Sequence, residues 1–197
     1  MDVEDSGESG LTRWSAATVH EDMWVDPEDD PRSSGGEAQD EKTVLAEYLR
    51  DYRLTLEIKC AGLDAEQMAR RSVPPSTMSL LGIIRHLADV ERNWFRWVME
   101  GTEVPWLYWS DSERDVDWNG AVADPEVVVR AWRDWRGEVA YAEQFVAECD
   151  NLDRLGTKFG GKPISLRRVM VHMIEEYARH CGHADLLRER IDGRIGQ

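Results

Sequence analysis

The sequence predicts an all-α fold, a bundle of four long helices. Four long segments repeat their apolar side chains with the 3.6-residue period of an amphipathic helix. Almost no segment shows the two-residue alternation of a half-buried strand. With 197 residues, 42% of them hydrophobic, and nine tryptophans, the chain can also enclose a substantial core.

The first 40 residues are expected to form an acidic, mostly flexible extension, and residues 41–197 the folded domain. Residues 1–41 hold 13 of the 39 acidic residues and only two basic ones, and glycine and proline interrupt them without a regular period. Four larger apolar side chains of the extension could dock on the domain, although a solvated tail is the favoured interpretation: Trp14, Met23, Trp24 and Val25.

Two long helices are expected in the first half of the domain. The first covers residues 41–61 and ends at a glycine, which is a plausible cap. A short helical turn at residues 64–71 begins at an aspartate in a capping position, and consecutive prolines then break the chain. The second long helix is expected from Thr77 or Ser79 to Glu100.

The second half begins with a long irregular connection, residues 101–123. A connection of this length is usually functional or packs as a lid. Its aromatic side chains are expected to cover the core, although they could also line a pocket. Because it is long enough to cross the bundle, the helices on either side are expected to run parallel. The third helix is expected from Asp124 to Cys149, a loop over residues 151–163, and the last helix after Ser165.

Composition excludes several classes of protein. The net charge is −15, but beyond residue 41 the 26 acidic and 22 basic residues nearly balance, so no basic face favours nucleic acid. The chain has no apolar run of membrane-spanning length and no secretory signal at its start, so a cytoplasmic location is expected. The three cysteines form no CxxC pair, and Cys60 and Cys181 are expected to be buried as small hydrophobic residues.

Three polar residues on two of the helices suggest a metal site. Glu176 and His180 are four residues apart on the last helix, so they lie on one side of it, next to its apolar stripe. His86 lies at the edge of the stripe of the second helix. Two histidines and one carboxylate suit a divalent metal of the zinc, nickel or iron type, and three ligands leave a position for water or substrate. The alternative is a buried hydrogen-bonded cluster without a metal.

Other charged residues near this pattern have more ordinary interpretations. Glu91 falls inside the apolar arc of the second helix, where an ion pair with an arginine of a neighbouring helix is favoured. A sharper hypothesis makes Glu91 a group that orients a metal ligand. The helical phase of Arg85 and Arg179 points both side chains outward, so neither is assigned to the site.

Two stretches closely resemble the DinB/YfiT-like superfamily, and within it the mini-circle protein branch. They are MSLLGIIRHLADVERNWFRWVMEG and SLRRVMVHMIEEYARHCGHADLLRERIDG, and the resemblance covers about residues 40–195. It implies an up-down-down-up four-helix bundle with a metal between helices. It also implies one ligand from the second helix, matched by His86, and two from the last helix, matched by Glu176 and His180. His183 stands where glutamine is common, which makes it a candidate to support a ligand.

The resemblance also implies a function. Members of the superfamily use low-molecular-weight thiols such as mycothiol, and the related mycothiol-dependent maleylpyruvate isomerase looks to use the same His, Glu, His set. The expectation is a metal-dependent enzyme, zinc first, with nickel or iron as alternatives, in which a thiol attacks an electrophile as in an S-transferase or isomerase. A homodimer is compatible with the resemblance, because relatives often pair their helices. The alternatives are a non-catalytic metal-binding or stress-associated protein, and an interaction protein that acts through its acidic tail.

Overall fold

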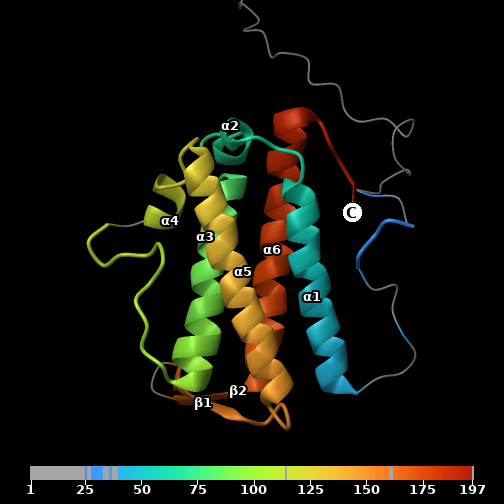
Figure 1. Ribbon diagram of the computed structural model, residues 1–197, viewed down its shortest axis with the longest axis vertical. Helices are drawn as coiled ribbons and strands as arrows, with labels where there is room; N and C mark the ends of the chain where they lie inside the picture. Colours follow the sequence, from blue (N-terminus) through green and yellow to red (C-terminus); the bar gives the residue numbers. More distant parts are fainter. Residues whose placement is uncertain are drawn as a thin grey trace, which may run out of the picture.

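Four long helices lie side by side and enclose the core, and their bounds are α1 (Glu41–Cys60), α3 (Leu80–Arg92), α5 (Pro125–Glu148) and α6 (Leu166–Asp192) (Figure 1). The computed structural model describes residues 25, 28–32, 36, 40–113, 115–159 and 162–196. The most extensive helix contacts join α1 with α6 and α3 with α5. The predicted all-α class is confirmed, because the described residues are mostly helical and form a single two-stranded sheet.

The helices begin where capping side chains satisfy their first N–H groups. Ser79 shows the pattern, since its hydroxyl oxygen accepts the N–H of Gly82 at 3.1 Å at the start of α3. The other predicted caps are confirmed in the same way: Asp64 at α2 (Ala65–Ala69), Asp124 at α5 and Ser165 at α6. Gly62, just beyond α1, adopts φ +74°, a left-handed conformation that glycine takes without strain.

The second long helix changes its winding over its last two turns. Residues Asn93–Glu100 form a π-helix, η1, which continues directly from α3. The predicted end of this helix at Glu100 is confirmed, and Gly101 follows it at φ +81°. The prediction of a single uniform helix is wrong, because the last eight residues form a π-helix. Hydrogen bonds of the i→i+5 type widen the turn. Trp94, Phe95 and Val98 of η1 are all buried in the core.

A β-hairpin occupies most of the segment between α5 and α6. The strand β1 (Leu155–Phe159) pairs antiparallel with β2 (Lys162–Ser165), so the loop predicted over residues 151–163 is wrong for this part. Glycine suggested a loop there, but Gly156 serves close packing instead. A Cβ at Gly156 would lie 2.5 Å from the carbonyl oxygen of Val98. The hairpin thereby covers η1 at the end of the molecule opposite α2 (Figure 1).

The long connection over residues 101–123 is fastened to α3 rather than free. It contains a short helix, α4 (Val116–Asn119), which the sequence did not predict. Its first half is held by Asp89 of α3, whose carboxylate accepts three consecutive backbone N–H groups at 2.7–2.8 Å, those of Leu107, Tyr108 and Trp109. Three charge-assisted hydrogen bonds to one carboxylate fix the path of this segment.

The apolar core runs along the inward sides of the four helices. Cys60 and Cys181 are buried in it with free thiols, as predicted. The opposite sides of the helices are largely polar, and no helix among the described residues is long and apolar enough to cross a membrane. Before α1, Arg32 donates to the Thr55 hydroxyl at 3.3 Å. The predictions for Trp14, Met23 and Trp24 fall outside the described residues.

Candidate metal centre

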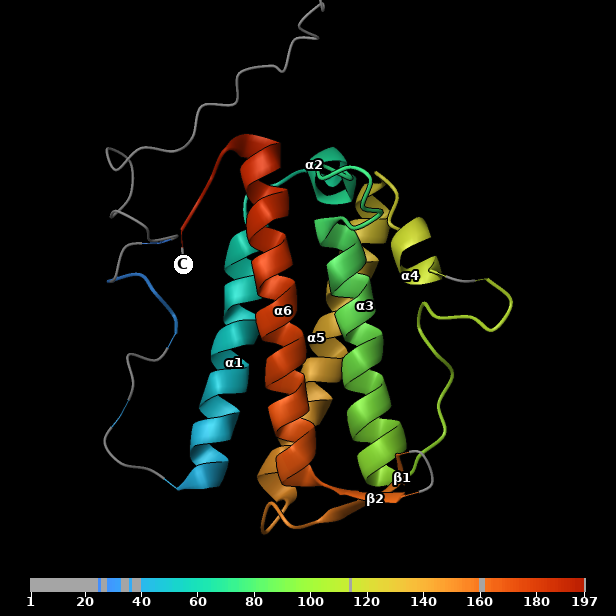
Figure 2. The ribbon, with the colours of Figure 1, turned by 180° about the vertical axis from the view of Figure 1, so that it is seen from behind.

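Side chains from α3 and α6, which lie side by side in Figure 2, converge on one point between the two helices. The Oε2 atom of Glu176 lies 4.0 Å from Nε2 of His86 and 3.6 Å from Nε2 of His180. The ligand atoms of all three residues lie within 4.8 Å of one another. The three residues singled out by the sequence pattern are thus brought together, and within the described ranges they are the one such group of three.

The local structure of α6 explains why two of these side chains share a side. Glu176 and His180 are one helical turn apart, between buried residues that face the core. His180 is buried and Glu176 is half-buried at the margin of the apolar stripe, which is the arrangement that the periodicity predicted. On α3, His86 follows the buried Arg85 and precedes the buried Leu87, so its ring lies at the edge of the α3–α6 contact.

The donor set fits a divalent transition metal. Two imidazole nitrogens and one carboxylate oxygen are donors that zinc, nickel and iron accept. Two ligands of one tetrahedral zinc ion lie about 3.4 Å apart, given metal–ligand distances of roughly 2.1 Å. The observed separations of 3.6 and 4.0 Å exceed that value by little, so small side-chain rotations suffice for both pairs. Three protein ligands leave one position for a substrate atom.

An aspartate that the sequence analysis missed orients His86. Nδ1 of His86 lies 3.0 Å from Oδ2 of Asp117 on α4. An ionised carboxylate only accepts, so Nδ1 carries the proton and the lone pair of Nε2 faces Glu176. This is the carboxylate–histidine arrangement that fixes the tautomer of metal ligands in proteins. Sequence spacing could not reveal it, because the connection holds several acidic residues and no periodicity ranks them.

Arg85 holds α4 in place. Its guanidinium donates to the main-chain oxygen of Asp117 at 2.7 Å and to that of Val116 at 2.9 Å, and it lies over the ring of Tyr108 at 4.1 Å. The prediction that Arg85 points outward is therefore wrong, since the residue is buried. The carbonyl groups of a short helix need donors, and helical phase alone does not show that a connection elsewhere in the chain supplies them.

Trp118 covers one side of the imidazole of His86. The two rings stack with centroids 5.2 Å apart and planes 23° apart, and the indole centroid lies 6.2 Å from that of His180. Gly82 makes this position available, because a Cβ there would lie 2.6 Å from the indole ring. The aromatic side chains of the connection were expected to cover the core or to line a pocket, and Trp118 lies against the candidate centre.

His183 lies next to His180, on the side away from Glu176. The Nδ1 atoms of the two rings are 3.4 Å apart, and the ring centroids 5.2 Å. His180 therefore presents Nε2 to the centre and Nδ1 to His183. Burial, and then the neighbouring His86 and His183, lower the pKa of His180 to about 3. Its imidazole is accordingly neutral near pH 7, which is the form that binds a metal.

The solvent side of Glu176 is bounded by two further residues of α6. Arg179 lies 3.1 Å from Oε1 of Glu176, and its side chain is 60% exposed, which agrees with its predicted outward direction. His172, one turn before Glu176, has its Nε2 3.9 Å from the same oxygen and its ring against Trp94. Oε1 of Glu176 thus has neighbours at the surface, while Oε2 faces the two imidazoles.

Glu91 forms the ion pair that was the favoured interpretation. Nε and Nη2 of Arg53 on α1 donate to its two carboxylate oxygens at 2.8 Å each, and the hydroxyl of Tyr177 donates to Oε1 at 2.7 Å. Glu91 is completely buried. Its role toward the metal stays a prediction, but Tyr177 directly follows Glu176 on α6.

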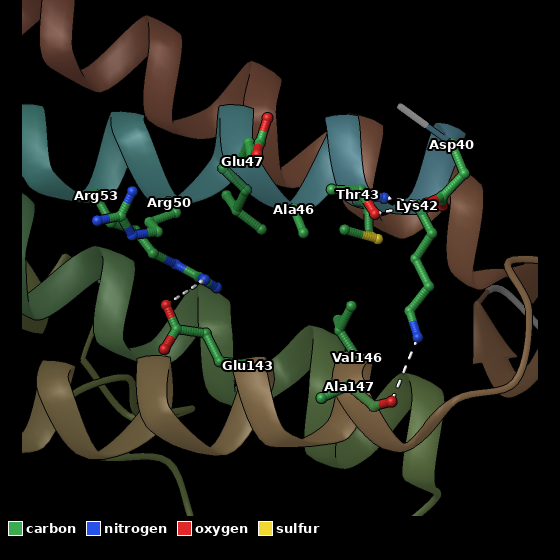
Figure 3. A pocket seen from close by; sticks show the side chains of 12 residues that line it. Asp40, Lys42, Thr43, Ala46, Glu47, Arg50, Arg53, Glu143, Val146 and Ala147 are labelled. Atoms are coloured by element: carbon green, nitrogen blue, oxygen red, sulfur yellow. Dashed lines mark hydrogen bonds and ion pairs between the residues drawn. The ribbon is translucent and has the colours of Figure 1, made fainter. Parts of the chain in front are cut away.

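A groove of about 500 Å³ opens elsewhere, between α1 and α5 (Figure 3). Along α1 its wall runs from Asp40 to Arg53, and Glu143 faces Arg53 from α5, with 3.5 Å between Oε1 and Nη1. His86, Glu176 and His180 come from the other two helices and do not line it. The groove and the candidate centre are therefore separate features.

Comparison with known proteins agrees with the geometry. The family model of the mycothiol-S-transferases matches residues 44–193, a range that includes all three converging residues. Among solved structures, the chain is similar to the crystal structure of a conserved protein from Enterococcus faecalis, with a TM-score of 0.58 and 16% identity over 79% of this chain and 99% of the other. That likeness shows the fold alone, and no curated protein matches the chain. The fold and the family match together place the chain in the DinB/YfiT-like superfamily, and within it the chain belongs to the mycothiol-S-transferase family.

Proposed function

We propose that this protein is a divalent-metal-dependent transferase that uses a low-molecular-weight thiol of the mycothiol type as its nucleophile. The observation that carries the proposal is the convergence of Nε2 of His86, Nε2 of His180 and Oε2 of Glu176 on one point. Membership of the mycothiol-S-transferase family supports the thiol. The donor set supports a metal, zinc first, with nickel or iron as alternatives.

The chain's own residues have distinct parts in this proposal. His86, Glu176 and His180 would hold the ion. Asp117 keeps the lone pair of His86 directed at the site, and His183 lies 3.4 Å from the other ring nitrogen of His180, Nδ1. When bound, a divalent ion supplies the positive charge that keeps a thiol, whose ordinary pKa is about 8.5, as the nucleophilic thiolate.

The reaction class follows from that thiolate. Its sulfur would form a bond to an electrophilic carbon of the second substrate, and the thiol proton would pass to solvent. The electron pair of the bond broken at that carbon would leave with a halide or with the oxygen of an opened epoxide, or, in a conjugated double bond, would move to the neighbouring carbon, which takes up a proton. The protein contributes by holding the two reactants in line and by keeping water away from the reacting atoms. Trp118, stacked on His86, excludes water from one side of the site.

The proposal also takes the four long helices as the up-down-down-up bundle implied by the superfamily. In Figure 1 the colours along the chain show α1 and α6 running away from the hairpin end, and α3 and α5 running toward it. Membership of the mini-circle branch and a homodimer stay predictions, and sedimentation of the purified protein tests the latter.

Metal content and thiol consumption together test the proposal. Plasma mass spectrometry of freshly purified protein is expected to find about one metal ion per chain, and His86→Ala is expected to lose it. His172→Ala is the matched control, since it removes another histidine beside Glu176 and should retain the metal. The wild type should consume mycothiol in the presence of an electrophile, and His86→Ala should not.

The opposite results would count against the proposal in different ways. Full metal content and activity in His86→Ala would show that the residues are wrongly assigned. A wild type that holds no metal and refuses added zinc and nickel would favour a non-catalytic binding protein instead.

A further inference from the structure

A chain of buried hydrogen bonds joins all four long helices. Arg53 of α1 donates twice to Glu91 of α3, each time at 2.8 Å. The hydroxyl of Tyr177 on α6 donates to Glu91 at 2.7 Å, and it accepts the indole N–H of Trp135 on α5 at 2.8 Å. None of the four residues is more than 5% exposed. We refer to these four residues as the buried network.

Two residues of the buried network, Glu91 and Tyr177, lie on the two helices that carry the candidate metal ligands. Tyr177 is the residue after Glu176, and Glu91 is five residues after His86 on α3. The hydrogen bond from Tyr177 to Glu91 therefore spans the same pair of helices that must bring Glu176 opposite His86. A shift of α6 along or around its axis would break this hydrogen bond and separate the two ligands together.

Stability alone is a poor explanation for the buried network. Moving two charges out of water costs several kcal/mol per ion, and replacing a buried ion pair by apolar side chains of similar volume is often neutral or stabilising. Apolar side chains, however, tolerate small slides of one helix against another. The directed bonds of Glu91 to two other helices favour the relative position at which all three have good geometry.

We propose that the buried network sets the register and rotation of α6 against α3, and that Glu91 and Tyr177 are thereby positioning residues for the metal centre. This inference rests on the proposed function, because it concerns how the same three ligands are brought together. It assigns Glu91 an indirect role, through Tyr177 and the backbone of α6, in place of direct contact with a ligand.

Tyr177→Phe is the first test, because it removes only the hydroxyl group at the centre of the buried network. Its matched control is Tyr108→Phe, which also removes a buried hydroxyl that donates to a carboxylate, that of Asp134 at 2.8 Å, but on the connection between η1 and α5. The readouts are the zinc affinity, from competition with a chromophoric chelator, and the visible absorption of the cobalt-substituted protein. Tyr177→Phe is expected to weaken zinc binding about tenfold and to alter the cobalt spectrum. Tyr108→Phe should do neither.

A second variant separates positioning from folding. Arg53→Met combined with Glu91→Leu removes both charges and leaves no unpaired ion in the core. The gain from removing a buried ion pair is expected to offset the cost of the Tyr177 hydroxyl, which loses its acceptor but still accepts the indole N–H of Trp135. This double variant is therefore expected to fold with a melting temperature close to that of the wild type. It should nevertheless bind zinc more weakly than the wild type, because Tyr177 then has no hydrogen-bond partner on α3 that fixes the position of α6 against that helix.

The outcomes distinguish this inference from the proposed function. Wild-type zinc affinity and cobalt spectrum in both Tyr177→Phe and the double variant would overturn the positioning role, whether or not the protein consumes mycothiol. Weakened metal binding in both, in a protein that transfers no thiol, would support the positioning role and refute the transferase. A wild type that takes up neither zinc nor cobalt would overturn both.

Discussion

Asp117→Asn probes the candidate centre with the smallest change in shape. In the wild type each carboxylate oxygen of Asp117 accepts one hydrogen bond, Oδ2 from Nδ1 of His86 and Oδ1 from the backbone N–H of Trp118, both at 3.0 Å. Asparagine has only one acceptor oxygen, so one of the two hydrogen bonds must be lost. If the oxygen stays with Trp118, the amide donates to Nδ1 and the proton of His86 moves to Nε2.

That tautomer cannot bind a metal, because its Nε2–H points at Glu176. If the amide turns the other way, the tautomer survives, and the N–H of Trp118 keeps only its hydrogen bond to the carbonyl oxygen of Asp115 at 3.1 Å. Loss of an outer partner of a metal-binding histidine typically weakens metal binding 10–100-fold. The corresponding change in binding free energy is about 1.4–2.8 kcal/mol. The fold should persist, because Arg85 binds the main-chain oxygen of Asp117 and not its side chain.

Two measurements check this prediction. Zinc titration gives the affinity, and the ¹⁵N chemical shifts of the imidazole nitrogens of His86 report which of them carries the proton. Asp124→Asn, at the exposed N-cap of α5, serves as the control for the loss of one negative charge and should leave both measurements unchanged. Wild-type zinc affinity in Asp117→Asn, with the proton still on Nδ1, would refute the idea that Asp117 orients this ligand.

Three other predictions concern the connection over residues 101–123, the cover of His86 and the buried cysteines. Asp89→Asn should lower the free energy of unfolding by about 1.5–3 kcal/mol in a urea titration, because one carboxylate holds three N–H groups of the connection. Gly82→Ala should weaken zinc binding and lower the melting temperature, since its Cβ would displace Trp118 from the imidazole that it covers. Burial raises the pKa of Cys60 and of Cys181 to about 12, so neither should react with a thiol reagent at pH 8 until the protein is unfolded.

The helices could be predicted from the sequence because their signals are local. Apolar side chains repeat every 3.6 residues along each helix, and Ser79, Asp124 and Ser165 bond to N–H groups only a few residues away. The hairpin before α6 could not be predicted in this way. Its place depends on Gly156 fitting against a carbonyl of η1, which is a contact between segments far apart in the chain.

The candidate centre likewise contains residues that local signals predict and residues whose contacts depend on distant segments. Glu176 and His180 share a helix, so their spacing placed them together, and His86 was identified by its position at the edge of a stripe and by the resemblance to the superfamily. The contacts of Asp117 and Trp118 with His86, and the burial of Arg85, were not predicted. They arise only because an irregular connection folds back on α3. Helical periodicity does not show where such a connection packs.

The pairing of the helices implies that an ion at the candidate metal centre would join two parts of the molecule. Since α1 packs mainly on α6 and α3 mainly on α5, the four long helices form two halves, each a pair of helices packed side by side, and the three candidate ligands are divided between these halves. An ion bound by His86 on one half and by Glu176 and His180 on the other would hold the two halves together. Its binding energy would then add to the work needed to part the halves, by RT ln(1 + [metal]/Kd). Chelation should therefore loosen the seam between α3 and α6 first, as faster amide hydrogen exchange along that seam.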